Sequence, residues 1–261
     1  MSARGKIAVA GATGRVGRHV VELLEERGHD VVGISRSLGV DVVTGEGLAE
    51  ALAGVETVVD AATGPSPEEG PATEFFTASA RNLQTLGERA GVQGIVVVSI
   101  IGVDRFTSGY QAAKHAQERM LLAGPIPVRI LRAAQFHEFV PQLVNWGRQN
   151  GVSYLPKMRT QLVAARTVAE ALADLATLPD SDPAGTNGAP IPEIAGPRPE
   201  SLDEMARLLA AHRRDPVRIE SVGDTAVGEG ELLANGALLP GPHATLAGPT
   251  FEEWLEGEPA N

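Results

Sequence analysis

Short apolar runs alternate along the first half of the chain with segments in which apolar residues recur every three or four positions. The first run covers residues 7–10 and the second covers 31–34, and each has the length of a buried strand. Between them, four apolar residues share one helical face: Val16, Val20, Leu23 and Leu24. Gly28 follows this face, where helices commonly end. The pattern therefore predicts a strand, a helix and a second strand in succession.

The same alternation continues to residue 136. Helices are predicted over 45–54 and 73–91, and a further helix carries Tyr110 and Lys114. Strands are predicted between them, over 55–63, 94–102 and 128–136. Strands that alternate with helices form right-handed crossovers and a parallel sheet that helices cover on both faces. We therefore predict the α/β class, with a doubly wound parallel Rossmann sheet.

The pattern is less regular after Phe136. A helix interrupted early by Pro141 is predicted over 137–151, and a strand followed by a helix over 161–178. The Pro- and Gly-rich stretch 180–200 is predicted to be loop with one short strand near Ile194. A helix is predicted from Ser201, with Ser201 and Glu204 as a capping box.

These elements predict two parts of the chain. A dinucleotide-binding Rossmann domain is predicted over 1–136, with 161–180 returning to its sheet. A small C-terminal α/β substrate lobe is predicted over 137–160 and 186–261. Ligands of open α/β sheets bind beyond the carboxyl ends of the strands, so we expect the lobe to cover that edge.

Composition narrows the range of partners. The 261 residues carry 33 acidic and 22 basic side chains, for a formal net charge of −11, and no basic patch offsets it. We therefore expect neither nucleic acid nor a membrane surface as a partner. Cysteine is absent and the six histidines lack metal-binding spacing, so no metal site is predicted. No apolar run approaches the roughly 18 residues of a membrane helix and no signal peptide is visible, so we expect a soluble, cytoplasmic protein.

A glycine turn joins the first predicted strand to the first helix. Gly11, Gly14 and Gly17 are spaced three residues apart. In dinucleotide-binding turns, the first glycine permits the tight turn, the second lets the backbone approach a pyrophosphate, and the third allows close packing of the helix on the strand. The position of the turn, directly after a strand and directly before a helix, favours dinucleotide binding over a plain connection.

The second strand ends in Ser35, Arg36 and Ser37 rather than in an acidic residue. In NAD-preferring sites an acidic side chain at this point binds the ribose 2′-hydroxyl, whereas an arginine accommodates a 2′-phosphate. Arg36 is predicted to pair with that phosphate, with Arg15 close enough to help, and the alternative is a solvated surface arginine. We therefore predict NADP as the cofactor, with NADPH favoured over NADH.

The order of these motifs resembles the short-chain dehydrogenase/reductase superfamily, in its atypical, NmrA-like branch. The residues that carry the resemblance span about the first 180 positions: the glycine turn 11–17, Asp41 and Val42, Asp60 to Ala62, Asn82, Ser99, Tyr110 with Lys114, and 132–136. The resemblance implies that Thr13 and Val16, in the glycine turn, contribute to cofactor binding. It also implies that Asp41 and Val42 lie against the adenine and that Ala61, Ala62 and Thr63 lie along the inner ribose.

The resemblance further implies a catalytic group. Ser99 and Tyr110 are expected beside the nicotinamide, and Lys114 on the hydroxyls of its ribose. A free tyrosine ionises near pH 10, and a lysine one helical turn away is expected to lower that pKa. Tyr110 could then protonate a carbonyl oxygen as hydride arrives, while Ser99, or Ser108 in its place, donates to the same oxygen. The alternative for Tyr110 is an aromatic side chain packed on the edge of the sheet.

Two functions are compatible with these residues. The first is an NADPH-dependent oxidoreductase that acts on a small carbonyl or quinone substrate, with Tyr110 as the proton donor. The second is a non-catalytic, NADP(H)-binding redox sensor or regulator of the NmrA-like type. The Tyr110 and Lys114 pair favours the first, because a sensor does not need it. His137 and Glu138 either line the substrate pocket or form a helix N-terminal pair.

Overall fold

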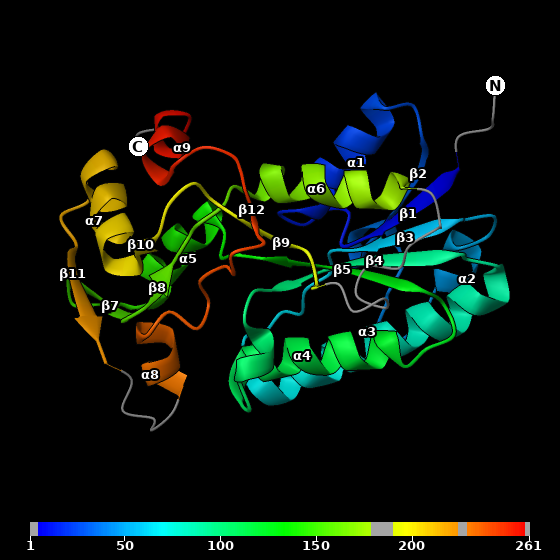
Figure 1. The fold of residues 1–261 in the computed structure, drawn as a ribbon, viewed down its shortest axis with the longest axis horizontal. Helices are drawn as coiled ribbons and strands as arrows, with labels where there is room; N and C mark the ends of the chain where they lie inside the picture. Colours follow the sequence, from blue (N-terminus) through cyan, green and yellow to red (C-terminus); the bar gives the residue numbers. More distant parts are fainter. Residues whose placement is uncertain (1–4, 179–189, 224–228, 259–261) are drawn as a thin grey trace. The chain divides into compact units, whose positions relative to one another are not determined.

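The computed structural model describes residues 5–178, 190–223 and 229–258 (Figure 1). The described residues form two compact units. Unit 1 comprises 5–99, 106–132, 168–178 and 190–192. Unit 2 comprises 100–105, 133–167, 193–223 and 229–258.

A parallel sheet of seven strands forms the centre of the fold; the sequence predicts a parallel sheet but not its edge strand β12. The strands follow the order β12-β9-β5-β4-β3-β1-β2. Their bounds are β1 Lys6–Ala10, β2 Asp30–Ile34, β3 Thr57–Asp60, β4 Gly94–Ile100, β5 Val128–Ala133, β9 Glu193–Ala195 and β12 Thr245–Leu246. β1 lies between β2 and β3, so the order reverses beside β1. The doubly wound α/β prediction is confirmed.

Helices connect successive strands and cover both faces of the sheet. α1 and α6 lie on one face and α3 and α4 on the other (Figure 1). The helix bounds are α1 Gly17–Glu26, α2 Leu48–Ala51, α3 Glu69–Ala90, α4 Gly109–Leu122 and α6 Ala165–Thr177. Three 3-10 turns, at Arg36–Leu38, Val103–Arg105 and His137–Phe139, complete the described connections. Gly28 and Gly91, both at positive φ, follow the ends of α1 and α3 as predicted, because glycine adopts this backbone conformation without strain.

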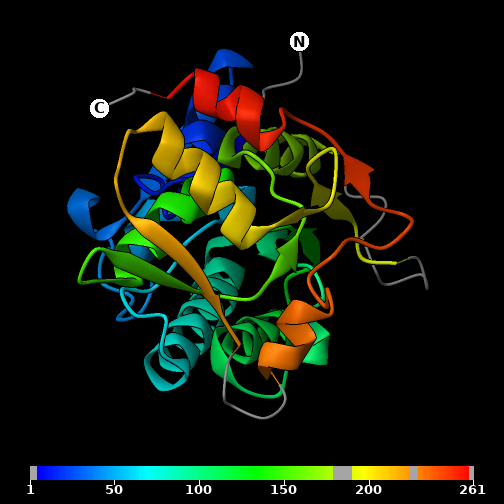
Figure 2. The same ribbon diagram turned by 90° about the vertical axis from the view of Figure 1, so that its left-hand side faces the viewer.

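Unit 2 contains a small sheet with helices beside it. Strands β6 Arg148–Gln149, β7 Val152–Pro156 and β11 Arg218–Val222 form a sheet in the order β11-β7-β6. β8 Arg159–Thr160 pairs with β10 Glu200–Ser201. Figure 2 shows α7 Leu202–His212 beside this small sheet. The remaining helices are α5 Val140–Trp146, α8 Glu229–Ala234 and α9 Phe251–Glu256.

Three local predictions after Phe136 need correction. Pro141 does not interrupt a helix but lies in the first turn of α5. Amides in a first helical turn have no partner within the helix, so proline is tolerated there. Residues 161–164 form a single bridge, from Val163 to Phe136, instead of a strand. Ser201 precedes α7 but makes no side-chain cap, and the capping box of this region joins Thr250 to Glu253 at the start of α9. The short strand near Ile194 is confirmed, while 179–189 of the stretch 180–200 lie outside the described residues.

None of the helices in the described part of the chain combines the length and the apolar character that a membrane span requires.

Candidate cofactor site and active site

The glycine turn directly connects β1 to α1. Gly11 has a φ of +76°, and its amide donates to the Ile34 carbonyl at 2.9 Å, so the turn is joined to the end of β2. The Gly14 amide donates to the Gly11 carbonyl at 2.8 Å. Val16, the residue before α1, provides no side-chain cap. The N-terminus of a helix attracts anions through its amide groups and its dipole, so the start of α1 fits a phosphate group.

A Cβ atom added to any of the three glycines would crowd the backbone, least severely at Gly14. A Cβ atom would lie 2.7 Å from the Ala61 carbonyl oxygen if added to Gly11. It would lie 3.0 Å from the Gly11 carbonyl oxygen if added to Gly14, and 2.1 Å from the same oxygen if added to Gly17. All these neighbours are backbone atoms, which cannot rotate away. The turn therefore has the bare backbone cradle that a dinucleotide pyrophosphate requires.

Hydroxyl groups connect the end of β2 to the glycine turn. Ser35 Oγ and Ser37 Oγ lie 2.9 Å apart, and Ser37 Oγ donates to Thr13 Oγ1 at 3.4 Å. Arg36 lies between these serines and is exposed, as is Arg15 in the turn. No acidic residue occurs among Ser35, Arg36 and Ser37, and the preference for NADP stays a prediction.

Asp41 and Val42 stabilise the loop after β2. Asp41 Oδ1 accepts from the amides of Val43, at 2.7 Å, and Thr44, at 3.3 Å. Val42 is buried in the core, and Asn82 of α3 donates to the carbonyls of Val42 and Val43, at 3.0 and 2.8 Å. The position of these residues against an adenine stays a prediction, because their described contacts are to the protein itself.

The segment after β3 begins at a buried carboxylate. Asp60 Oδ1 accepts from the Ala62 amide at 3.1 Å, which fixes the direction of the chain through Ala61 and Ala62. Thr63 follows with an exposed side chain. Burial raises the pKa of Asp60, and Lys114 opposes this rise by its charge.

Tyr110 lies in the first turn of α4. Its hydroxyl and Thr63 Oγ1 are 3.0 Å apart, and its ring meets the Phe76 ring edge-on with the centroids 5.5 Å apart. Glu69 of α3 accepts from the Gly109 amide at 2.8 Å and so holds the start of α4. These contacts, all within unit 1, direct the Tyr110 hydroxyl toward the segment that follows β3.

Lys114 shares α4 with Tyr110, one turn later, but its amine has other partners. Lys114 is only 5% exposed, and its Nζ donates to the Val98 carbonyl at 2.7 Å and to Gln117 Oε1 at 2.6 Å. Gln117 Nε2 in turn donates to Asp60 Oδ2 at 2.8 Å. The amine also lies 4.6 Å from the centroid of the Phe76 ring. A buried polar chain thus joins β3, β4 and α4. The ribose contact expected of Lys114 stays a prediction.

The expected effect of Lys114 on Tyr110 is wrong for this structure. Burial raises the pKa of the Tyr110 phenol, and the hydrogen bond to Thr63 is the interaction that opposes the rise. For Lys114 itself, burial lowers the pKa to about 8, although the charges of Asp60 and Glu118 oppose this. The helical spacing predicted that the two residues are neighbours but not which groups their polar atoms contact.

The pKa of Lys114 predicts a pH-dependent stability. The unfolded chain holds the Lys114 proton up to about pH 10.5, whereas the folded chain releases it near pH 8. Between these values the unfolded state binds more protons, so folding stability rises with pH. The free energy of unfolding of the wild type, minus that of Lys114→Met, should rise by up to about 3 kcal/mol across this interval. Urea unfolding at several pH values measures it; the subtraction removes the titration of Tyr110, and a flat difference would contradict the prediction.

The two candidate serines differ in burial and in hydrogen bonding. It lies in β4, is 2% exposed, and its Oγ has no hydrogen-bond partner among the described residues. A buried hydroxyl without a partner is costly, and a bound ligand could supply the missing partner. Ser108 is exposed at the residue before α4 and does not cap that helix with its side chain. The expectation that Ser99 binds a substrate oxygen stays a prediction.

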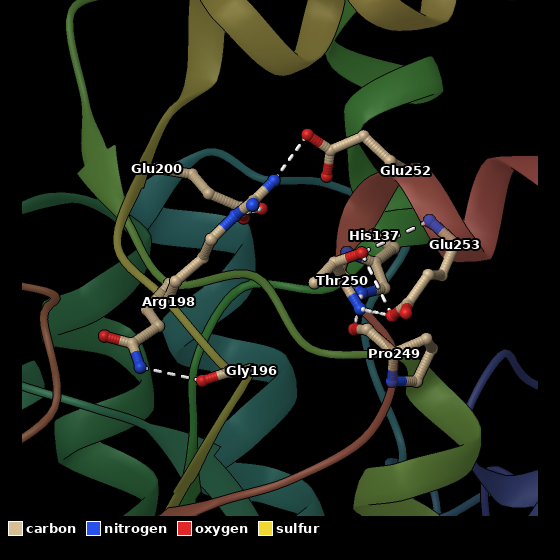
Figure 3. A network of polar contacts seen from close by, with 9 residues as sticks. His137, Gly196, Arg198, Glu200, Pro249, Thr250, Glu252 and Glu253 are labelled. Atoms are coloured by element: carbon tan, nitrogen blue, oxygen red, sulfur yellow. Dashed lines mark hydrogen bonds and ion pairs between the residues drawn. The ribbon is translucent and has the colours of Figure 1, made fainter.

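His137 and Glu138 stabilise unit 2. His137 is fully buried, lies between 5.5 and 5.6 Å from the rings of Phe251 and Trp254, and shares a 3.1 Å hydrogen bond with the Pro249 carbonyl (Figure 3). Burial lowers the pKa of His137 to about 4. Glu138 accepts from the Ala165 amide, at 3.1 and 3.2 Å, at the start of α6. These contacts favour the helix-terminal interpretation over a substrate pocket.

Sequence reasoning missed the polar residues behind the site. Gln117 is the link between Lys114 and Asp60, and a buried pair between Glu118 and Arg132, with bonds of 2.8 and 3.0 Å, lies next along α4. The available signal was spacing: Gln117 and Glu118 lie three and four residues after Lys114, on its side of the helix.

Known proteins resemble the chain in sequence. The model of a family described as NAD(P)H-binding matches residues 11–179. A 4-hydroxy-tetrahydrodipicolinate reductase from Natronomonas pharaonis is 29% identical over 238 residues, which cover 88% of this chain and 82% of that protein.

Solved structures share the fold at low identity. MoeE5 in complex with UDP-glucuronic acid and NAD has a TM-score of 0.70 and is 20% identical, with 97% of each chain covered. UDP-N-acetylglucosamine 4-epimerase from Bacillus cereus has a TM-score of 0.65 and is 18% identical, covering 97% of this chain and 94% of that one.

Proposed function

Because the chain belongs to the NAD(P)H-binding family, with the fold of the atypical short-chain dehydrogenases/reductases, we propose that it is an NADPH-dependent reductase of a small carbonyl or quinone compound. The observation that carries the proposal is the placement of Tyr110. Its phenol, backed by the Phe76 ring, is held at the segment after β3, in the same unit as the glycine cradle.

In the proposed reaction, different residues would bind the cofactor, donate the proton and orient the substrate. The glycine turn and the start of α1 bind the pyrophosphate, and Arg36 with Ser37 binds the 2′-phosphate. The nicotinamide, when bound, supplies the hydride. Tyr110 holds the proton that neutralises the substrate oxygen, and the unpartnered Ser99 hydroxyl donates to that oxygen. The chain from Lys114 through Gln117 to Asp60 fixes α4, and thereby Tyr110.

One observation favours the alternative, a redox sensor that binds NADP(H) without catalysis. Burial raises the pKa of Tyr110, and the Lys114 amine is bonded to Val98 and Gln117 rather than to the phenol. A tyrosine in this state is a weak proton donor at neutral pH, because a general acid works best when its pKa lies near the working pH.

NADPH consumption across a panel of ketones, aldehydes and quinones distinguishes the two functions. A reductase oxidises NADPH in proportion to enzyme with at least one panel member. Tight NADPH binding by calorimetry, together with no turnover across the panel, would favour the sensor and contradict the reductase.

Arg36 should determine the cofactor preference. Replacing Arg36 with Asp removes the expected partner of the 2′-phosphate and adds repulsion, so NADPH affinity should fall about 10- to 100-fold while NADH affinity changes little. Calorimetric titration of both cofactors measures the two affinities. Arg81→Asp, the same change in charge at an exposed position of α3, is the control. Equal losses for both cofactors would show that Arg36 does not bind the phosphate.

A further inference from the structure

The hydroxyl that contacts Tyr110 belongs to Thr63. The two oxygens are 3.0 Å apart, and either can be the donor while both groups are protonated. Once Tyr110 has lost its proton, its oxygen can only accept, so Thr63 must donate. Thr63 follows β3 in a segment whose backbone Asp60 holds through the Ala62 amide.

Three charged groups, one each on α3, α4 and β3, have other partners. On α3, Glu69 accepts from the Gly109 amide. On α4 itself, Lys114 donates to Val98 and Gln117. On β3, Asp60 accepts from Gln117 and from the backbone. Phe76 supplies an apolar ring face. Among the described residues, Thr63 is therefore the polar partner of the phenol oxygen.

We propose that Thr63 is a positioning residue for Tyr110: its hydroxyl orients the phenol and donates to the phenolate oxygen when the proton has left. The role in turnover rests on the proposed function, whereas the contact itself does not. Stabilisation of the ionised phenol, which the sequence analysis expected from Lys114, is thus assigned to Thr63.

The chain offers a direct test because it contains only two tyrosines. In a Tyr154→Phe background, fluorotyrosine incorporated in place of tyrosine labels position 110 alone. Its phenol ionises at lower pH than that of tyrosine, which keeps the titration below strongly alkaline conditions. Fluorine NMR then follows the ionisation without substrate or cofactor.

Thr63→Val keeps the shape of the side chain and removes its hydroxyl. The ionisation constant of residue 110 should fall about tenfold, because a hydrogen bond to a charged oxygen is lost. Thr63→Ser should restore the parent titration. Thr107→Val, the same change at an exposed residue just before α4, should leave it unchanged. A parent-like titration of Thr63→Val would overturn the proposal, as would a shift that Thr63→Ser shares, since that would reflect lost packing rather than a lost hydroxyl.

Turnover provides the second measurement. With a substrate from the panel, the alkaline limit of the pH–rate profile should move to higher pH in Thr63→Val, in parallel with the NMR titration, and return in Thr63→Ser. An unmoved limit beside a shifted titration would overturn the role of Thr63 in turnover. Failure of the reductase proposal is recognised separately, because it appears as absent NADPH consumption in the wild type.

Discussion

Tyr110→Phe should abolish most turnover while the protein folds and binds NADPH normally. The substitution keeps the ring and its edge-on contact with Phe76 and removes only the hydroxyl that Thr63 contacts. Loss of a general acid lowers the rate by about 10²- to 10⁴-fold. Because the hydroxyl acts in the transition state, the loss should appear in kcat with KM little changed.

The matched control is Tyr154→Phe, which removes the other phenol of the chain, on β7 and 39% exposed. It should keep wild-type turnover. Steady-state kinetics with the best panel substrate, and calorimetry with NADPH, give the two readouts. If Tyr110→Phe reduced the substrate at the wild-type rate, Tyr110 would not be the proton donor.

Gly17→Ala should cost both stability and cofactor binding. The added Cβ would lie 2.1 Å from the Gly11 carbonyl oxygen and 2.7 Å from its carbon, and neither atom can move unless the turn opens. Overpacking of this kind costs about 1–3 kcal/mol of folding stability. Opening the turn also displaces the backbone amides that we propose bind the pyrophosphate, so NADPH affinity should fall by at least about 100-fold.

Gly70→Ala is the control for this prediction. Gly70 lies in the first turn of α3, as Gly17 lies in the first turn of α1, but an added Cβ there would meet no atom within 4 Å. Alanine is the better helix former, so this variant should be as stable as the wild type or slightly more stable. Thermal unfolding with and without NADPH measures both effects. Ligand-induced stabilisation that is equal in Gly17→Ala and in the wild type would refute the assigned cradle.

The alternating strands and helices before Phe136 could be predicted from local sequence patterns. The glycine turn was readable because its spacing and its place between a strand and a helix are both sequence features, and Gly11 indeed has positive φ. After Phe136, short strands pair with residues far along the chain, as β7 does with β11, and such pairings have no local signal. The capping-box pattern at Ser201 shows the same limit, since the pattern was present and the side-chain bond was not.

The helix that carries the candidate residues could be predicted from the sequence, whereas the contacts of their side chains could not. Spacing placed Tyr110 and Lys114 on one helix, which is correct. Their contacts depend on other elements: Phe76 of α3 packs against Tyr110, and the Val98 carbonyl of β4 accepts from Lys114. A buried amine takes whatever acceptors tertiary packing offers, and Gln117 became visible as its partner only in three dimensions.

The packing of the glycine turn bears on how such a protein could be re-engineered. Side chains added at Gly14 and Gly17 would approach the same carbonyl oxygen, that of Gly11, and at Gly17 no neighbouring substitution could relieve the clash, because the oxygen belongs to the backbone. Sequence space is therefore nearly closed at Gly17. It is open at Ser35, Arg36 and Ser37, where the arginine is exposed and the serines are joined through hydroxyls. Efforts to exchange one nicotinamide cofactor for another belong in this second segment.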